Sequence, residues 1–130
     1  MRAFVDACIA IYAVEDKSAS GQAVRAAIDA LKPGDLLIAT ELVRFECLVG
    51  PMRRNDNATL DKFRSFFQET DFVELRRAVF ERAATWRAAG LKPLDALHLA
   101  AAVEGQCDEF WTNDDRLSKV DAGIRIRGIV

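Results

Sequence analysis

The sequence predicts an α/β fold, with one parallel sheet of about five strands flanked by helices on both faces. The main observation is that short apolar runs alternate with longer segments of helical periodicity, the pattern of parallel βαβ units. The chain has 130 residues, of which 51% are hydrophobic, enough for one compact core. Because no repeat, low-complexity tract or linker interrupts the pattern, we expect a single domain over residues 1–130.

The expected elements follow from local signals. Strands are expected at residues 3–5, 36–39, 72–75, 109–112 and 124–130, and helices at 18–31, 41–49, 57–69, 75–88 and 94–104. Thr40 is a good N-cap residue, Gly90 is placed to end a helix, and Pro93 suits the first helical turn.

Charge and cysteine content exclude some classes of protein. The chain carries 18 basic and 20 acidic residues, and its net charge of −2 neither indicates nor excludes a nucleic-acid partner. Three cysteines without a C-x-x-C pair, and a single histidine, argue against a disulfide framework or a zinc centre. No stretch approaches the roughly 20 apolar residues of a membrane span, so a cytoplasmic location is expected.

Acidic residues follow two of the expected strands directly. Asp6 follows the first strand, and Asp114 and Asp115 follow the strand that ends at Thr112. The carboxyl ends of parallel strands meet at one edge of a sheet, where open α/β sheets bind their ligands. We therefore expect these acids to share that edge. Asp114 and Asp115 could alternatively serve only as the start of a short helix capped by Thr112 or Asn113.

Glu46 and Asp95 are the other two candidate acids. The helical neighbours of Glu46 three and four residues away are apolar, so Glu46 is expected on a buried stripe, where a carboxylate needs a partner or a metal. Asp95 lies in the first turn of the last helix, where an acid often only complements the helix dipole. His98, one turn further on, is expected to be packed or to support the acids rather than to act as a base.

Clustered carboxylates repel one another unless a cation lies among them. Oxygen ligands without histidine or thiolate suit Mg²⁺ or Mn²⁺, and such ions activate water and neutralise charge on a phosphodiester. Hydrolysis of phosphate esters is therefore the reaction that these residues best explain.

The chain resembles the PIN-domain nucleases, in particular the VapC-type ribonuclease toxins of bacterial toxin–antitoxin pairs. The matching segments are Phe4–Asp6, Phe45–Gly50, Pro93–Ala100 and Thr112–Asp114, which occur in the family's order. The resemblance implies a PIN fold in which Asp6, Glu46, Asp95 and Asp114 bind Mg²⁺ or Mn²⁺ and are the catalytic residues, with Asp115 as a possible auxiliary and Thr112 and Asn113 in support. It further implies endonucleolytic cleavage of RNA by activated water, a homodimer or larger assembly, and inhibition by a cognate antitoxin.

One position departs from the family. Ala7 and Cys8 stand where Ser or Thr is common after the first acid, so a hydroxyl that could orient a ligand is missing there. Among the basic residues, Arg53 and Arg54 follow the helix that carries Glu46 and are candidates to bind RNA phosphates.

Other protein classes share part of this pattern. A metal-dependent phosphatase of the haloacid-dehalogenase type would need a second Asp where this chain has Cys8, and a receiver domain would need a further acidic pair and a late lysine. A non-catalytic PIN-fold module that binds RNA or protein would not need the acids at all.

Overall fold

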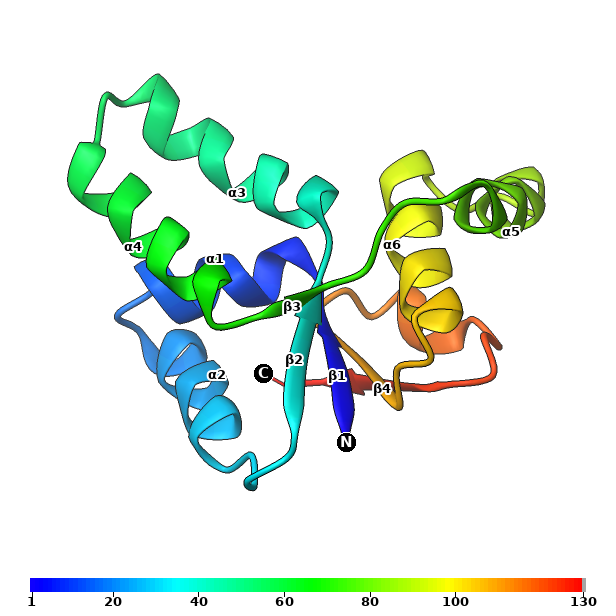
Figure 1. Ribbon diagram of the computed structural model, residues 1–130, viewed down its shortest axis with the longest axis horizontal. Helices are drawn as coiled ribbons and strands as arrows, with labels where there is room; N and C mark the ends of the chain where they lie inside the picture. Colours follow the sequence, from blue (N-terminus) through cyan, green and yellow to red (C-terminus); the bar gives the residue numbers. More distant parts are fainter. Residues whose placement is uncertain (130) are drawn as a thin grey trace.

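The computed structural model describes residues 1–129 and contains a five-stranded, fully parallel sheet. The strands lie in the order β3-β2-β1-β4-β5 (Figure 1). Their bounds are β1 Arg2–Val5, β2 Leu36–Ala39, β3 Asp71–Phe72, β4 Glu109–Thr112 and β5 Arg125–Gly128. The predicted fold class, α/β with one parallel sheet, is confirmed.

Six α-helices connect the strands in the described part of the chain. They are α1 Ala7–Glu15, α2 Ala19–Asp29, α3 Glu41–Arg53, α4 Asn57–Gln68, α5 Arg77–Ala88 and α6 Pro93–Glu104, and a short 3₁₀ helix, η1 Leu117–Lys119, precedes β5. Because crossovers between parallel strands are right-handed, α1 to α4 lie on one side of the sheet and α5 and α6 on the other (Figure 1). None of the helices within residues 1–129 combines the length and the apolar character needed to cross a membrane.

Several element boundaries differ from the sequence prediction. The third strand is only Asp71–Phe72, the helix after it begins at Arg77, and the last described strand ends at Gly128. The helix expected over 41–49 continues to Arg53, with Pro51 inside it. Val130, included in the expected last strand, lies outside the described residues.

Helix α1 was not predicted, and its sequence explains why. Eight of its nine residues are apolar, so no polar stripe marks a helical period. The structure surrounds this helix with protein, because α1 packs against β1, β4, α2, α3 and α4. A helix that is apolar on most sides is stable only in such a position.

The core is built on the two central strands. Phe4 of β1 and Phe110 of β4 are fully buried and stacked, with ring centroids 5.3 Å apart. Trp111 is also fully buried, and its indole N–H donates to Glu109 at 2.9 Å. The carboxylate of Glu109 is further paired with Arg125 at 3.0 Å, which satisfies a charge that burial would otherwise make costly.

The neighbouring strands β1 and β4 mark the point where the chain connections diverge. From β1 the chain continues to β2 on one side, and from β4 it continues to β5 on the other. The amide of Asp6 donates to the carbonyl of Trp111 at 3.0 Å, which extends the pairing of the two strands to their carboxyl ends. A crevice at such a divergence is the usual ligand site of an open α/β sheet.

Candidate active site

Asp6 is fixed at the carboxyl end of β1 by two hydrogen bonds. One carboxylate oxygen accepts from the amide of Ala7 at 2.8 Å, so that Asp6 is the N-cap of α1. The other accepts from the hydroxyl of Thr112 at 2.8 Å. Only 8% of Asp6 is exposed. The carboxylate therefore has one defined orientation at the end of the central strand.

Thr112 connects Asp6 to the loop that carries Asp114. Its hydroxyl is buried, donates to Asp6 and accepts from the amide of Asp114 at 3.1 Å. One threonine thus sets the relative position of two acids that are far apart in the sequence. Thr112 therefore contacts both acids, and its role in supporting a bound ion stays a prediction.

Cys8 lies beside the same pair, with its sulfur 3.8 Å from an oxygen of Asp6 and 3.9 Å from the hydroxyl of Thr112. Burial, with a further contribution from the charge of Asp6, raises the pKa of the Cys8 thiol to about 11. The thiol is therefore neutral near pH 7 and serves as a weak donor.

Glu46 reaches the site from α3 and pairs with the Nε2 atom of His98 on α6. The histidine is buried, with 2% exposed, whereas 26% of the Glu46 side chain is exposed. The prediction of a buried stripe was wrong in degree, because Glu46 is partly exposed and lines a cavity. The expectation that His98 is packed is confirmed.

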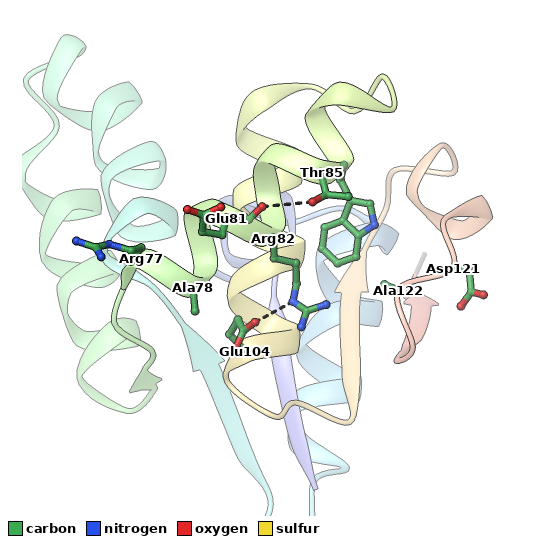
Figure 2. Close-up of a pocket in the computed structure, with 9 residues that line it drawn as sticks. Arg77, Ala78, Glu81, Arg82, Thr85, Glu104, Asp121 and Ala122 are labelled. Atoms are coloured by element: carbon green, nitrogen blue, oxygen red, sulfur yellow. Dashed lines mark hydrogen bonds and ion pairs between the residues drawn. The ribbon is translucent and has the colours of Figure 1, made fainter.

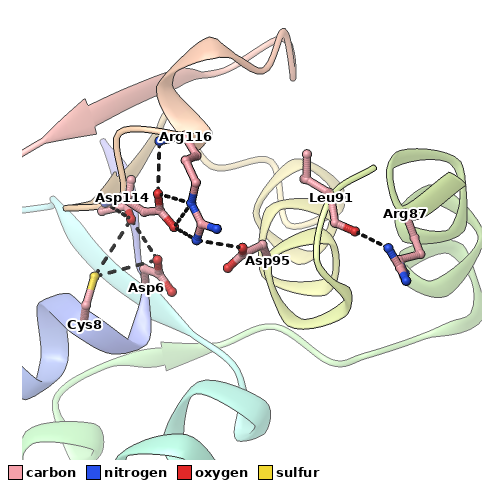
Figure 3. Close-up of polar contacts among 8 residues, drawn as sticks. Asp6, Cys8, Arg87, Leu91, Asp95, Asp114 and Arg116 are labelled. Carbon is pink, nitrogen blue, oxygen red and sulfur yellow. Dashed lines mark hydrogen bonds and ion pairs between the residues drawn. The ribbon is translucent and has the colours of Figure 1, made fainter. Parts of the chain in front are cut away.

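Asp95 and Asp114 face each other across a guanidinium group that the sequence analysis did not single out. Arg116 donates through Nε to the two carboxylate oxygens of Asp114, at 2.9 and 3.2 Å, and through Nη2 to the same group. The same Nη2 lies 3.8 Å from an oxygen of Asp95. Figure 3 shows Arg116 between the two acids, with Asp6 and Cys8 beside Asp114.

The acids influence one another electrostatically. Burial, followed by the charges of Asp6 and Asp114, raises the pKa of Asp95 above its usual range. Hydrogen bonds from Arg116 lower the pKa of Asp114. Asp95 has the looser ion pair with Arg116, at 3.8 Å, and its pKa is raised rather than lowered.

A cavity of about 620 Å³ opens over these residues. It is lined by Asp6, Ala7, Cys8, Tyr12, Glu46, Asn113, Asp114, Asp115 and Arg116. Asp115 is exposed at its rim. Ala7 presents only a methyl group to this cavity, so the hydroxyl common in the family has no replacement from that position.

A larger cavity, of about 780 Å³, lies between α5 and the segment before β5, beside Trp86 and Arg82 (Figure 2). Two of its charged groups pair with each other, since Arg82 donates to Glu104 at 2.9 Å. None of the four predicted acids lines it. This cavity is the larger of the two, but the smaller cavity contains the predicted acids and is therefore the better candidate for the active site.

The acidic cavity suits an oxygen-liganded divalent cation by the chemistry of its donors. As placed, no three His, Cys, Asp or Glu side chains within residues 1–129 are grouped closely enough to hold a metal ion. The reason lies in their present partners: Asp6 faces Thr112, Glu46 faces His98, and Asp114 faces Arg116. A guanidinium already lies between Asp95 and Asp114, so the position attracts positive charge.

The two arginines predicted to bind phosphates do not line this cavity. Arg54 pairs with Glu15 at 2.7 Å, which joins the ends of α3 and α1, and it lies 3.8 Å from Asp56. Arg53 is exposed in the last turn of α3. Arg116 is the basic residue that the structure places at the acids. Arg116 pairs with Asp114, which lies two residues earlier in the same loop. Helical or strand periodicity does not identify a pair at this spacing in a loop.

Known structures share this fold over nearly the whole chain. VapBC2 from Rickettsia felis, bound to a promoter DNA fragment, matches with a TM-score of 0.83 and 12% identity, covering 98% of each chain. VapBC from Salmonella typhimurium, bound to DNA, matches with a TM-score of 0.82 and 15% identity over 100% of this chain and 99% of that chain. VapC20 from Mycobacterium tuberculosis, a toxin that cleaves the sarcin–ricin loop, gives a TM-score of 0.74 and 14% identity over 89% and 92%.

Among curated proteins, none matches the sequence. The family model described as PIN domain, in contrast, matches residues 3–123, which includes all four predicted acids. This match spans most of the 130 residues. By sequence as well as by fold, the chain belongs to the PIN domain family.

Proposed function

We propose that this protein is an Mg²⁺- or Mn²⁺-dependent endoribonuclease and the toxin of a toxin–antitoxin pair. The observation that carries the proposal is the convergence of acids from separate segments on one cavity. Asp6, Glu46 and Asp114 line it, and Asp95 is linked to it through Arg116. In a PIN-domain chain this arrangement supports hydrolysis of a phosphodiester.

Asp6, Glu46, Asp95 and Asp114 would hold the cation, with Asp115 as an auxiliary ligand. A divalent ion supplies neutralisation of phosphate charge and a water of lowered pKa. The protein's own contribution is orientation. Thr112 fixes one carboxylate oxygen of Asp6 and the backbone of Asp114, and buried His98 pairs with Glu46. Asn113 is a further residue that lines the cavity.

Two partners belong to the proposal. A cognate antitoxin is supported by the likeness to VapBC complexes, whose fold this chain shares along nearly its full length. A homodimer is part of the proposal because the chain resembles VapC-type toxins. Phe45 on α3 is 61% exposed and Phe80 on α5 is 50% exposed, and a contact between two copies that covered either ring would bury a large apolar area.

The test is cleavage of RNA by the purified protein at millimolar Mg²⁺ or Mn²⁺, with circular RNA as one substrate to establish endonucleolytic attack. Cleavage should disappear with a chelator and fall on the order of 100-fold or more in Asp6→Asn and in Asp95→Asn. Asp61→Asn is the matched control, because Asp61 lies on α4 with 76% of its side chain exposed.

If every cellular RNA stays intact and expression is harmless, the nuclease proposal is contradicted and a binding module remains. If a phosphomonoester is hydrolysed instead of RNA, the phosphatase alternative is correct. Cleavage that survives in Asp6→Asn would place the active centre elsewhere.

A further inference from the structure

The Arg116 guanidinium lies between the carboxylates of Asp95 and Asp114 (Figure 3). Its Nε and Nη2 atoms both face Asp114, and its backbone amide also donates to that carboxylate, at 3.0 Å. Both oxygens of Asp114 therefore have donors within this one residue. The link to Asp95 is looser, at 3.8 Å.

The guanidinium is held by charge rather than by packing. The Arg116 side chain is 62% exposed, and Asp95 and Asp114 are its acidic partners among residues 1–129. An exposed arginine whose contacts are ionic can rotate into solvent without opening a void in the core. The carboxylates, in contrast, are 22% and 24% exposed and are carried by the start of α6 and by the loop after β4.

We propose that Arg116 is a tethered counter-ion of the acidic cavity, which competes directly with the divalent cation for Asp95 and Asp114. This inference rests on the proposed function, because it presumes that the acids bind such an ion. Without the ion, the single positive charge of the guanidinium partly offsets the charge of the two acids and limits their repulsion. Binding of the ion requires Arg116 to leave, so part of the binding free energy is used to break its ion pair.

Because of this competition, the protein should bind the metal ion measurably more weakly than it would without Arg116. Breaking a forked but largely exposed ion pair should change the dissociation constant of the metal by about fivefold. Removal of the positive charge adds to the gain by relieving repulsion of the incoming ion. Arg116→Ala should therefore bind Mn²⁺ about five- to tenfold more tightly than the unaltered protein.

Arg116→Lys separates direct competition from simple charge repulsion. Lysine keeps the charge but has no planar fork to engage both oxygens of a carboxylate. Direct competition predicts about a two- to threefold gain in Mn²⁺ affinity for Arg116→Lys, between the unaltered protein and Arg116→Ala. Repulsion alone predicts no gain for the lysine variant.

The experiment is titration of the full-length protein with Mn²⁺, followed by calorimetry and by the paramagnetic resonance signal of free Mn²⁺. Arg76→Ala is the matched control, because Arg76 also pairs with an acid two residues away, Glu74 at 3.0 Å, but lies outside the acidic cavity. Its Mn²⁺ affinity should equal that of the unaltered protein. In cleavage assays, the Mn²⁺ concentration for half-maximal rate should fall in the same order as the dissociation constants.

The outcomes distinguish this inference from the proposed function. If the unaltered protein binds no Mn²⁺, the proposed function fails and the inference fails with it. If it binds Mn²⁺ but Arg116→Ala binds equally or more weakly, the tethered counter-ion is wrong and the proposed function stands. Equal affinity of Arg116→Lys and the unaltered protein also overturns direct competition, and this comparison holds even if the alanine variant does not fold.

Discussion

Replacing Thr112 by valine should destabilise the protein and disorder the acidic cavity together. Valine keeps the shape of threonine but removes a hydroxyl that makes two hydrogen bonds, a buried one to Asp6 at 2.8 Å and a partly buried one from the amide of Asp114 at 3.1 Å. A hydrogen bond to a charged group contributes about 1.5–3 kcal/mol and a neutral one about 0.5–1.5 kcal/mol. The free energy of unfolding should therefore fall by about 2–4 kcal/mol.

Unfolding in urea, followed by the fluorescence of Trp111 and Trp86, measures this loss. Thr112→Ser keeps the hydroxyl and loses only a buried methyl group, so its loss should be about 1 kcal/mol. Thr85→Val is the control, because Thr85 is exposed on α5 and its hydroxyl only contacts its own helix at 3.4 Å. The reasoning is refuted if Thr112→Val loses no more stability than Thr112→Ser.

Three further predictions concern charge, backbone packing and metal linkage. Folding raises the pKa of Asp95 above its ordinary value of 3.8. The folded state therefore binds the proton of Asp95 more tightly than the unfolded state does. The contribution of Asp95 to the free energy of unfolding consequently falls as the pH rises. The stability of Asp95→Asn relative to the unaltered protein should accordingly increase from about pH 4 to about pH 7, measured by urea unfolding at each pH; a constant difference would contradict the cause assigned to the shift. Gly21→Ala should lower the free energy of unfolding by about 2–3 kcal/mol, because the new Cβ would lie 1.8 Å from the carbonyl oxygen of Asp16. Gly50→Ala should leave the free energy of unfolding unchanged or raise it by up to about 1 kcal/mol, since its Cβ meets only the flexible end of Arg54 at 3.2 Å. Thermal unfolding should show that Mn²⁺ at about 100 times its Kd raises the Tm by roughly 10 °C, that Asp61→Asn responds likewise, and that Asp6→Asn does not; an equal response of Asp6→Asn would remove that acid from the site.

Much of the fold could be predicted because hydrophobic patterns and capping residues act locally. Thr40 caps α3 through a hydrogen bond from the amide of Val43, and Pro93 begins α6, as their types suggest. Helix α1 was missed because it is apolar on nearly all sides. The helix over 41–49 was predicted too short because Pro51 and Gly50 are tolerated where α3 packs on α4 and α1.

The candidate site, too, could be predicted from the sequence only in part. Asp6 and Asp114 were found because the ends of parallel strands share one edge, and the structure joins them through Thr112. The partner of Glu46 could not be predicted, since His98 lies 52 residues away on another helix and only the tertiary fold brings the two together. Arg116 was missed because one of its acidic partners lies in the same loop and the other lies on α6.

The position of bound Mn²⁺ tests most directly whether acids from four segments form one cation site. In crystals grown with Mn²⁺, anomalous scattering at a wavelength near the manganese edge locates the ion without reference to any assumed ligand. We predict a peak in the cavity lined by Asp6, Glu46 and Asp114, with Asp95 among its ligands and the Arg116 guanidinium turned away from Asp95. No peak in that cavity at saturating Mn²⁺, or a peak only at other residues, would contradict the proposed metal-dependent nuclease.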